Sequence, residues 1–482
     1  MSDNSEKKSH LKLWQVLLAT ALLLIFVFCL FTGLRAISYK KTLQPSELSI
    51  EEVTSLSNLL LEKYPGQYQI LKELPYNIDQ ANLDVWAKAA ILIDVSNGNV
   101  LYQKNADQII PPASMTKLFA MYVVEEEVAA GRLSYEQEIP LPPESWACNM
   151  PPHSSLMFLG KGQRVTLEEL LLGLSICSGN DAAYALAYTV CNSMEEFVER
   201  MNLVASDLGL GNTHFVESSG YSENNRTTAR EMAKFCAVYL RRHPSSLHRF
   251  HSVLDFTYPK ERNLAPGDKL AAQDFSQGLP QKITMPITQE NTNPLLGKLQ
   301  GCDGLKTGYI DESGYNLALT AVRGETRFLS VTLGGPGSSA REGQAGRVHD
   351  GTELMEWAFR NFADYSLQVK VHPYIVRAFN SSEKMLRLIP AYTDETFTVP
   401  YITGSSMAEN LDAVKVDVKL PDSIWGLVEQ GSQYGSIQIS LGEYLLQEIP
   451  LVADRSLSKG NVFIACSDYL INGLLRRIHS SQ

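Results

Sequence analysis

The chain lacks several common signatures of catalytic and binding sites. Its seven cysteines form no Cys-x-x-Cys pair, which argues against a zinc ribbon or a thioredoxin-type redox site. It has no His-Glu-x-x-His helix for a catalytic zinc, no Gly-x-Ser-x-Gly turn and no glycine-rich phosphate loop. Without such a helix, His248 and His251 are expected on a solvated surface. The sequence therefore predicts neither a metal site nor a cofactor.

An excess of basic residues is also missing. The chain has 42 lysines and arginines against 53 aspartates and glutamates, a formal net charge of -11 at pH 7. Since nucleic-acid binding relies on basic side chains that neutralise phosphates, no nucleic-acid partner is expected. Cys29 lies in an apolar segment, and the other six cysteines are scattered and expected to be mostly buried free thiols, with one or two disulfides open if the chain is exported. The length of 482 residues allows two or three domains.

One long apolar run stands near the N-terminus, at residues 13–34. Its length of about 22 residues is enough to cross a bilayer as a helix. Three lysines within residues 1–12 predict a cytoplasmic N-terminus, although the basic residues that begin at Arg35 weaken this orientation signal. A secretory signal peptide is the competing interpretation. The long apolar core and the lack of a small-x-small cleavage site favour an uncleaved anchor.

The rest of the chain changes character in four steps. Residues 35–85 are expected to form a stalk with one short helix. Residues 86–362 mix hairpin and helix signals, including a capping box opened by Thr166, and predict an α/β (α+β) domain with an antiparallel sheet covered by helices. Residues 363–458 hold short β-prone runs between prolines and glycines, typical of a small all-β domain. Residues 459–482 predict an amphipathic helix, which either lies in the lipid headgroup layer or docks on its own domain.

The first chemical motif is Ser114-Met-Thr-Lys117, at the start of an apolar helix expected to end near Ala130. Ser-x-x-Lys is common by chance, so its local setting carries the weight. A serine at a helix start lies in a positive local potential, and Lys117 is one turn further on, within reach of the hydroxyl. A serine hydroxyl is a poor nucleophile at neutral pH and needs such a base. Burial and a second cation would both lower the pKa of Lys117, as this role requires.

Two further motifs follow in order. Ser178-Gly-Asn180 lies between two helical segments, where Ser178 is a candidate proton relay and Asn180 a candidate support for the lysine and a substrate amide. Lys306-Thr307-Gly308 occurs once. Lys306 and Thr307 are candidates to bind a terminal carboxylate and Lys306 is the expected second cation, while Gly308 allows close approach of a substrate backbone. The N–H groups of Ser114 and Tyr309 are candidate oxyanion donors. Each motif alone is weak, but the ordered set describes acyl transfer through a covalent ester.

These residues resemble the penicillin-binding serine enzymes, most closely the low-molecular-mass D-alanyl-D-alanine carboxypeptidases. The likeness extends to the residues that flank the motifs, at 90–94, 112–117, 303–309 and 313–316. It covers about residues 86–362, and more loosely the β-rich region and the tail. A spanning N-terminal anchor with a stalk is a departure from that family, in which a cleaved signal is more usual.

The resemblance implies a β-lactamase/transpeptidase-like catalytic domain on the outer side of a bacterial cytoplasmic membrane. It implies that Ser114 forms an acyl-enzyme with the D-Ala-D-Ala end of a peptidoglycan stem peptide, and that β-lactam antibiotics acylate the same serine. The β domain and the C-terminal helix would hold the site near the membrane. Arg341 stands where the family often has an arginine that assists carboxylate binding.

Other functions use the same residues. A serine β-lactamase is disfavoured because no Glu-x-x-Leu-Asn stands between the second and third motifs. A D,D-endopeptidase that cuts crosslinks and a transpeptidase remain open. A catalytically silent penicillin or muropeptide receptor is the alternative from another class, and a fluorescent penicillin separates it because a receptor forms no covalent adduct.

Overall fold

The structure is a computed structural model that describes residues 3–40, 49–64, 71–74, 81–368, 374–392, 394–400 and 414–479. The chain divides into two compact units. The larger unit comprises Gln67–Tyr365 and Thr396–Leu411. The smaller unit comprises Met1–Gly66, Ser366–Glu395 and Asp412–Gln482.

The larger unit is built on a six-stranded, mostly antiparallel sheet in the order β1-β3-β2-β10-β9-β8, in which the β1–β3 pair is parallel. Its strands are β1 (Lys72–Glu73), β2 (Ala89–Asp94), β3 (Asn99–Lys104), β8 (Cys302–Ile310), β9 (Gly314–Arg323) and β10 (Thr326–Gly335). Strand β8 lies at an edge of this sheet, so one side of its backbone is free of strand partners within the described sheet. Strands β2 and β3, β8 and β9, and β9 and β10 are antiparallel neighbours that follow one another along the chain, so the hairpin signals within residues 86–362 are confirmed.

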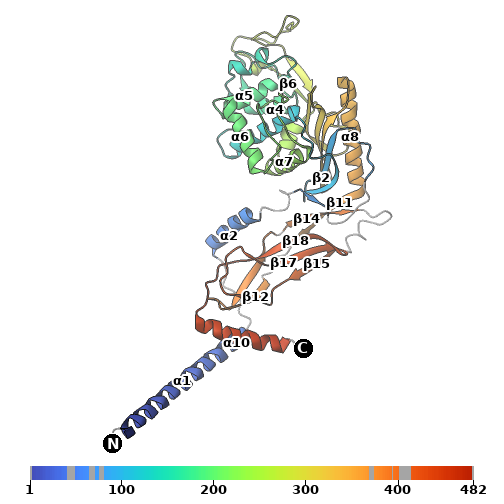
Figure 1. The fold of residues 1–482 in the computed structure, drawn as a ribbon. Helices are drawn as coiled ribbons and strands as arrows, with labels where there is room; N and C mark the ends of the chain where they lie inside the picture. Colours follow the sequence, from blue (N-terminus) through green and yellow to red (C-terminus); the bar gives the residue numbers. More distant parts are fainter. Residues whose placement is uncertain are drawn as a thin grey trace. The chain divides into compact units, whose positions relative to one another are not determined.

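Helices cover both faces of this sheet (Figure 1). Side chains of β2 alternate, with Ala89, Ile91 and Ile93 in one hydrophobic core and Ala90 and Leu92 in the other. The long helix α8 packs on one face and α7 on the other. The α-helices of this unit are α3 (Lys117–Ala129), α4 (Leu167–Ser175), α5 (Asn180–Val190), α6 (Met194–Asp207), α7 (Ala229–Arg242) and α8 (Ala340–Asn361). The predicted architecture of an antiparallel sheet between helices is therefore confirmed.

Short elements complete the larger unit. Two small antiparallel pairs are β4 (Glu138–Ile139) with β5 (Val165–Thr166), and β6 (Asp255–Tyr258) with β7 (Ile287–Glu290). The short helical turns are η2 (Ala113–Thr116), η3 (Pro143–Ser145), η4 (Ala147–Asn149), η5 (Leu247–His251) and η6 (Glu261–Asn263). Strands β11 (Phe362–Gln368) and β14 (Asp394–Pro400) form a two-stranded sheet.

The smaller unit contains a second six-stranded sheet, in the order β15-β17-β18-β13-β12-β16. Its strands are β12 (Tyr374–Phe379), β13 (Met385–Pro390), β15 (Val414–Lys419), β16 (Ser423–Trp425), β17 (Gln433–Leu441) and β18 (Tyr444–Ala453). Its helices are α1 (Asp3–Lys40), α2 (Ile50–Lys63) and α10 (Val462–His479). Helices α1 and α10 contact each other at the end of this unit (Figure 1). Within the described ranges, Trp14–Tyr39 of α1 is the one segment long and apolar enough to cross a membrane.

Three details test the local predictions. The capping box is present: Thr166 Oγ1 accepts from Glu169 N, and the Glu169 carboxylate accepts from Thr166 N. Helix α8 begins at Ala340, because the Ser339 side chain accepts a hydrogen bond from Glu342 N and caps the helix. All seven cysteines are described and free, as expected, but of the six outside the apolar segment two are buried, three are partly buried and one is exposed, so the expectation that most are buried is wrong.

Candidate active site

The nucleophile candidate lies on a strained turn. Ser114 belongs to η2, and α3 begins at Lys117, so the predicted helix start is confirmed with a tighter first turn. Ala113 and Ser178 both have left-handed backbone conformations, with φ of 51° and 57°. Such conformations are costly for residues with a Cβ and cluster at functional sites, where the surrounding structure holds them. Ser178 opens the second predicted motif, and Ala113 directly precedes Ser114 of the first.

The Lys117 amine contacts members of two of the predicted motifs. Lys117 is fully buried, and its Nζ lies 3.0 Å from Ser114 Oγ and 2.8 Å from Asn180 Oδ1. A third partner is the Ser219 carbonyl oxygen at 2.5 Å. A neutral amine has two N–H groups and one lone pair. The amide and carbonyl oxygens accept the two N–H groups, which leaves the lone pair for the proton of the Ser114 hydroxyl.

Burial tunes this amine for proton transfer. Desolvation lowers the pKa of Lys117 to about 7, although the nearby carboxylates of Glu217 and Asp181 oppose the shift. At neutral pH a large share of the amine is therefore uncharged and able to accept a proton. Burial, one of the two expected causes, lowers the pKa of Lys117. The expected repulsion from the second cation instead lowers the pKa of Lys306.

The pH dependence of acylation should report this amine. Since the uncharged form is the base, the rate of acylation by a fluorescent penicillin should rise as pH increases through about 7. Between pH 6 and pH 8 the neutral fraction of a group with that pKa rises about tenfold. Rates of labelling by the fluorescent penicillin, followed on gels between pH 6 and pH 8, measure this rise. A rate that is flat from pH 6 to pH 8 would contradict the assignment of Lys117 as the titrating group.

The third motif reaches the second through a buried contact. Lys306 Nζ lies 2.9 Å from Ser178 Oγ and 3.2 Å from the Thr307 carbonyl oxygen. Burial first, and then the charges of Lys117 and Arg347, hold the pKa of Lys306 well below its usual range. Two amines thus flank the space around Ser114 and Ser178. Thr307 Oγ1 donates to Thr292 Oγ1 at 2.7 Å, which fixes its rotamer.

Two glycines permit close backbone approach at the nucleophile. A Cβ on Gly308 would lie 2.5 Å from the Pro112 carbonyl oxygen, so this glycine lets β8 pack against the chain's own Ser114 segment. The predicted reason, close approach of a substrate backbone, is therefore not the first constraint on this residue. A Cβ on Gly220 would lie 1.9 Å from the Ala113 carbonyl oxygen.

A buried carboxylate that the sequence did not single out supports the second motif. Asp181 accepts from Met157 N at 2.8 Å and from Leu159 N at 3.0 Å. Burial raises the pKa of Asp181, while its backbone hydrogen bonds oppose this. The aspartate therefore ties the start of α5, directly after Asn180, to the segment that borders the cavity at Ser155. Its position next to Asn180 was the only available signal.

His251 supports the third motif through a hydrogen bond to the backbone of β8. It is fully buried, so the expected surface position is wrong for His251, whereas His248 is exposed. Burial lowers the pKa of His251 to about 4, which keeps the ring neutral. Its Nδ1 lies 3.2 Å from the Leu305 carbonyl oxygen, and its Nε2 lies 2.9 Å from Tyr239 Oη. Because a carbonyl only accepts, Nδ1 carries the proton and Nε2 accepts from the tyrosine. This contact holds β8 one residue before Lys306.

The arginine candidate is not brought into the cluster. Arg341 is exposed in the first turn of α8, and no hydrogen bond among the described residues joins it to the motifs. Arg347, also on α8 and not singled out in the sequence, is buried instead. Its guanidinium donates to the Gly308 carbonyl oxygen at 2.5 Å and to the Asn316 carbonyl oxygen at 3.1 Å. Burial lowers the pKa of Arg347 to about 10.

An open cavity of about 800 Å³ gives access to this cluster. Among the residues that line it are Ser114, His153, Asn180, Tyr221, Tyr309 and Asp311. Tyr309 is 44% exposed and lines the same cavity as Ser114. The described part of the chain contains no group of three or more His, Cys, Asp or Glu side chains able to hold a metal ion.

Comparisons with known proteins point to one family. The family model described as D-alanyl-D-alanine carboxypeptidase matches residues 76–337, more than half of the chain. The chain is 28% identical over 375 residues to D-alanyl-D-alanine carboxypeptidase DacF of Bacillus subtilis, which covers 77% of this chain and 86% of that protein. It is 28% identical over 391 residues to DacA of Escherichia coli, covering 80% of this chain and 87% of the relative.

A solved structure agrees with these relatives. Penicillin-binding protein 5 of Haemophilus influenzae matches with a TM-score of 0.66 and 27% identity, covering 80% of this chain and all of that one (100%). The β-lactamase/transpeptidase-like fold and the second β-rich domain expected from the motifs are confirmed. The chain belongs to the D-alanyl-D-alanine carboxypeptidase family of serine peptidases, as its three motifs predict.

Proposed function

We propose that this enzyme removes the terminal D-alanine from peptidoglycan stem pentapeptides through an acyl-enzyme on Ser114. The observation that carries the proposal is the contact of 3.0 Å between Lys117 Nζ and Ser114 Oγ, with the other two neighbours of the amine able only to accept. A neutral Lys117 is thereby directed to take its third hydrogen bond from the serine. The family relationship supplies the substrate class.

The reaction proceeds in two steps. In the first, Ser114 Oγ attacks the carbonyl carbon of the penultimate D-alanine, and Lys117 takes the hydroxyl proton. The N–H groups of Ser114 and Tyr309 stabilise the oxyanion, each worth about 3 kcal/mol of barrier. Collapse of the intermediate breaks the amide bond, and the proton passes by way of Ser178 to the leaving D-alanine amine. In the second step water attacks the ester carbon and Lys117 takes a proton from it. The bond from the acyl carbon to Ser114 Oγ then breaks, Lys117 returns the proton to Oγ, and the shortened peptide leaves with a new terminal carboxylate.

The substrate carboxylate is assigned to the third motif. Lys306 and Thr307 lie on the edge strand β8, where an extended peptide can align with the free side of the strand. The buried Lys306 amine contacts Ser178, so it also helps to orient the relay. Arg341 has no described contact with this cluster, and carboxylate recognition is assigned to Lys306 and Thr307 without it. β-Lactams are proposed to acylate Ser114 through the same contacts.

We also propose a location for the enzyme. Helix α1 crosses the bacterial cytoplasmic membrane, residues 1–12 lie in the cytoplasm, and both compact units lie on the outer side. The apolar length of Trp14–Tyr39 and the three lysines before it support this orientation. Helix α10 presents exposed apolar side chains, among them Phe463, Leu470 and Leu474, and is assigned to the headgroup layer.

Product analysis with purified full-length enzyme in detergent tests the function. The enzyme should release D-alanine from a D-Ala-D-Ala pentapeptide and form a covalent adduct with a fluorescent penicillin, and Ser114→Ala should do neither. A crosslinked muropeptide dimer, supplied in parallel, separates the endopeptidase alternative. If the enzyme cleaves the dimer and leaves the pentapeptide intact, it is an endopeptidase and the carboxypeptidase proposal is wrong. Penicillin binding without an adduct, unchanged in Ser114→Ala, would identify a silent receptor.

A further inference from the structure

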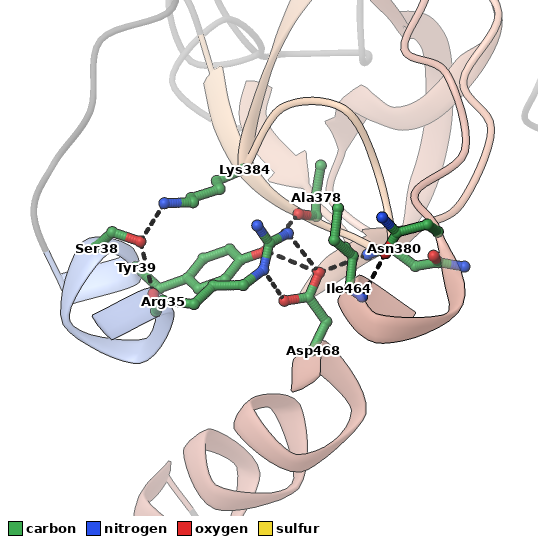
Figure 2. Close-up of polar contacts among 9 residues, drawn as sticks. Arg35, Ser38, Tyr39, Ala378, Asn380, Lys384, Ile464 and Asp468 are labelled. Carbon is green, nitrogen blue, oxygen red and sulfur yellow. Dashed lines mark hydrogen bonds and ion pairs between the residues drawn. The ribbon is translucent and has the colours of Figure 1, made fainter. Parts of the chain in front are cut away.

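A buried polar cluster joins the end of α1 to α10 within the smaller unit (Figure 2). Arg35 donates two hydrogen bonds to the Asp468 carboxylate, at 2.5 Å from Nε and 2.8 Å from Nη2. Tyr39 Oη lies 3.2 Å from the same carboxylate and 3.0 Å from the Ala378 carbonyl oxygen. Asn380 N donates to Asp468 Oδ2 at 2.7 Å. The cluster thus connects α1, α10 and the end of strand β12.

Apolar contacts surround this cluster. Tyr39 and Phe379 pack with their ring centroids 4.8 Å apart, and Ile471 of α10 completes a small buried core. Nearer the N-terminus, Phe28 of α1 and Phe463 of α10 lie with ring centroids 6.3 Å apart. The two helices therefore meet at two levels. The last turn of α1 is part of this small hydrophobic core within the smaller unit.

The Asp468 carboxylate makes this contact a structural requirement. Its side chain has no exposed surface, and Arg35 is its partner in the ion pair. A buried carboxylate that loses its cation is strongly destabilising, since nothing replaces the lost solvation. Cleavage within the apolar segment upstream of Arg35 would break the contact at Phe28, and cleavage after Tyr39 would also leave Asp468 without its cation. Residues 35–39 are thus needed for the fold of the smaller unit, in which their partners on α10 and β12 lie more than 300 residues away in sequence.

We infer that α1 is retained as a permanent part of the smaller unit, and that the Arg35–Asp468 pair fastens it to α10 to form a two-helix membrane anchor. A groove of about 460 Å³ at this contact is lined by Phe28, Trp425, Ala465, Cys466, Tyr469 and Leu470. Because Phe28 lies inside the apolar span of α1, the groove faces the acyl chains of the adjoining leaflet. The pairing also explains why Arg35 does not oppose the orientation set by the N-terminal lysines: its charge is neutralised by Asp468.

The first test asks whether α1 remains on the mature protein. The full chain carries one epitope tag before residue 1 and another after residue 482, and is expressed in bacterial membranes. Both tags should stay on a single full-length polypeptide that reacts with a fluorescent penicillin. A penicillin-reactive protein that has lost the N-terminal tag would overturn the inference. The penicillin signal also distinguishes this outcome from a failure of the proposed enzyme function.

The second test asks whether the two helices touch in the membrane. In a background with Cys29 and Cys466 changed to serine, Phe28→Cys with Phe463→Cys should be joined by a short bismaleimide within one chain. Leu18→Cys with Phe463→Cys is the matched control, because Leu18 lies about 15 Å further along α1. Equal crosslinking of both pairs, or none of the first, would overturn the contact.

The third test addresses the ion pair itself. Arg35→Gln should raise the rate of trypsin cleavage within the smaller unit about tenfold or more. The double variant Arg35→Gln with Asp468→Asn should return to within about threefold of the parent, since removing both partners leaves no unpaired charge. Arg476→Gln, an exposed arginine on α10, is the control and should change nothing. If Arg35→Gln is cleaved by trypsin as slowly as the parent, the ion pair does not hold α1 against α10.

Discussion

Replacing Lys117 with methionine should lower the rate of acylation by penicillin by about a thousandfold or more. General bases contribute about 10² to 10⁴ in rate, and no other neutral amine contacts Ser114 in the described structure. Methionine has a similar length and no charge, so it fills the buried site without a desolvation penalty. It leaves Asn180 Oδ1 and the Ser219 carbonyl oxygen without their donor, which costs about 1–3 kcal/mol of stability for each oxygen. Labelling time courses with a fluorescent penicillin measure the loss.

A matched control separates catalysis from folding. Lys161 is exposed, and Lys161→Met should keep the parent rate of acylation. Thermal unfolding of both variants shows whether the fold is kept. Normal labelling of a folded Lys117→Met protein would remove Lys117 from the role of base. Loss of labelling together with loss of the cooperative transition would require Lys117→Gln, which retains a donor for the two oxygens and still lacks the base.

The sequence predicted the parts of the site whose residues are close along the chain. Ser114 and Lys117 are one turn apart, and the structure places their side chains in contact. The order of the three motifs also predicted that distant stretches of the chain meet. The contact between Lys306 and Ser178, which are 128 positions apart, confirms this. Family membership and fold followed from the same motifs. The correct predictions of the site, the family and the fold therefore came mainly from local spacing and from the order of the motifs.

The supporting residues could not be read from the sequence because they act through space. The Ser219 carbonyl oxygen, which accepts from Lys117, lies 102 positions away and is a backbone group that no side-chain pattern marks. Asp181 and Arg347 also bind backbone atoms of other segments. His251 was expected on the surface because it belongs to no metal-binding motif, yet it ends the π-helical turn η5 and is fully buried. Burial of single polar residues in turns follows no period that sequence reasoning can detect.

The stretch assigned to a stalk shows the same limit at the level of domains. The sequence treats residues 35–85 as a stalk because they lie between the apolar run and the start of the strand signals near Trp86. In the structure Tyr39 and Leu56 are buried in the smaller unit, whereas Val85 belongs to a core of the larger one. The smaller unit is assembled from three separate segments of the chain. A linear scan assigns such segments to their neighbours in sequence, because it cannot see partners hundreds of residues away.

Gly220→Ala should destabilise the larger unit by about 3 kcal/mol or more and abolish acylation. Gly220 has a φ of 80°, and a methyl group there would lie 1.9 Å from the Ala113 carbonyl oxygen. Real Cβ atoms do not approach backbone this closely, so the Ser114 segment or the loop at Ser219 must move. Either shift separates Ser114 from Lys117, whose amine is held by the Ser219 carbonyl oxygen. A large loss from backbone strain is among the few causes of effects of this size.

The neighbouring Gly211→Ala provides the control for this prediction. Its added methyl meets no atom within 4 Å, and its backbone conformation is open to other residues. That variant should keep the parent midpoint or gain slightly, because alanine restricts the unfolded chain by about 0.4–1 kcal/mol. Gly220→Ala should lower the midpoint by about 6 °C or more in a thermal scan. Equal unfolding midpoints and equal penicillin labelling in the two variants would contradict the prediction. The loop at Gly220 would then move without cost, and the Ser219 carbonyl oxygen would not set the position of the Lys117 amine.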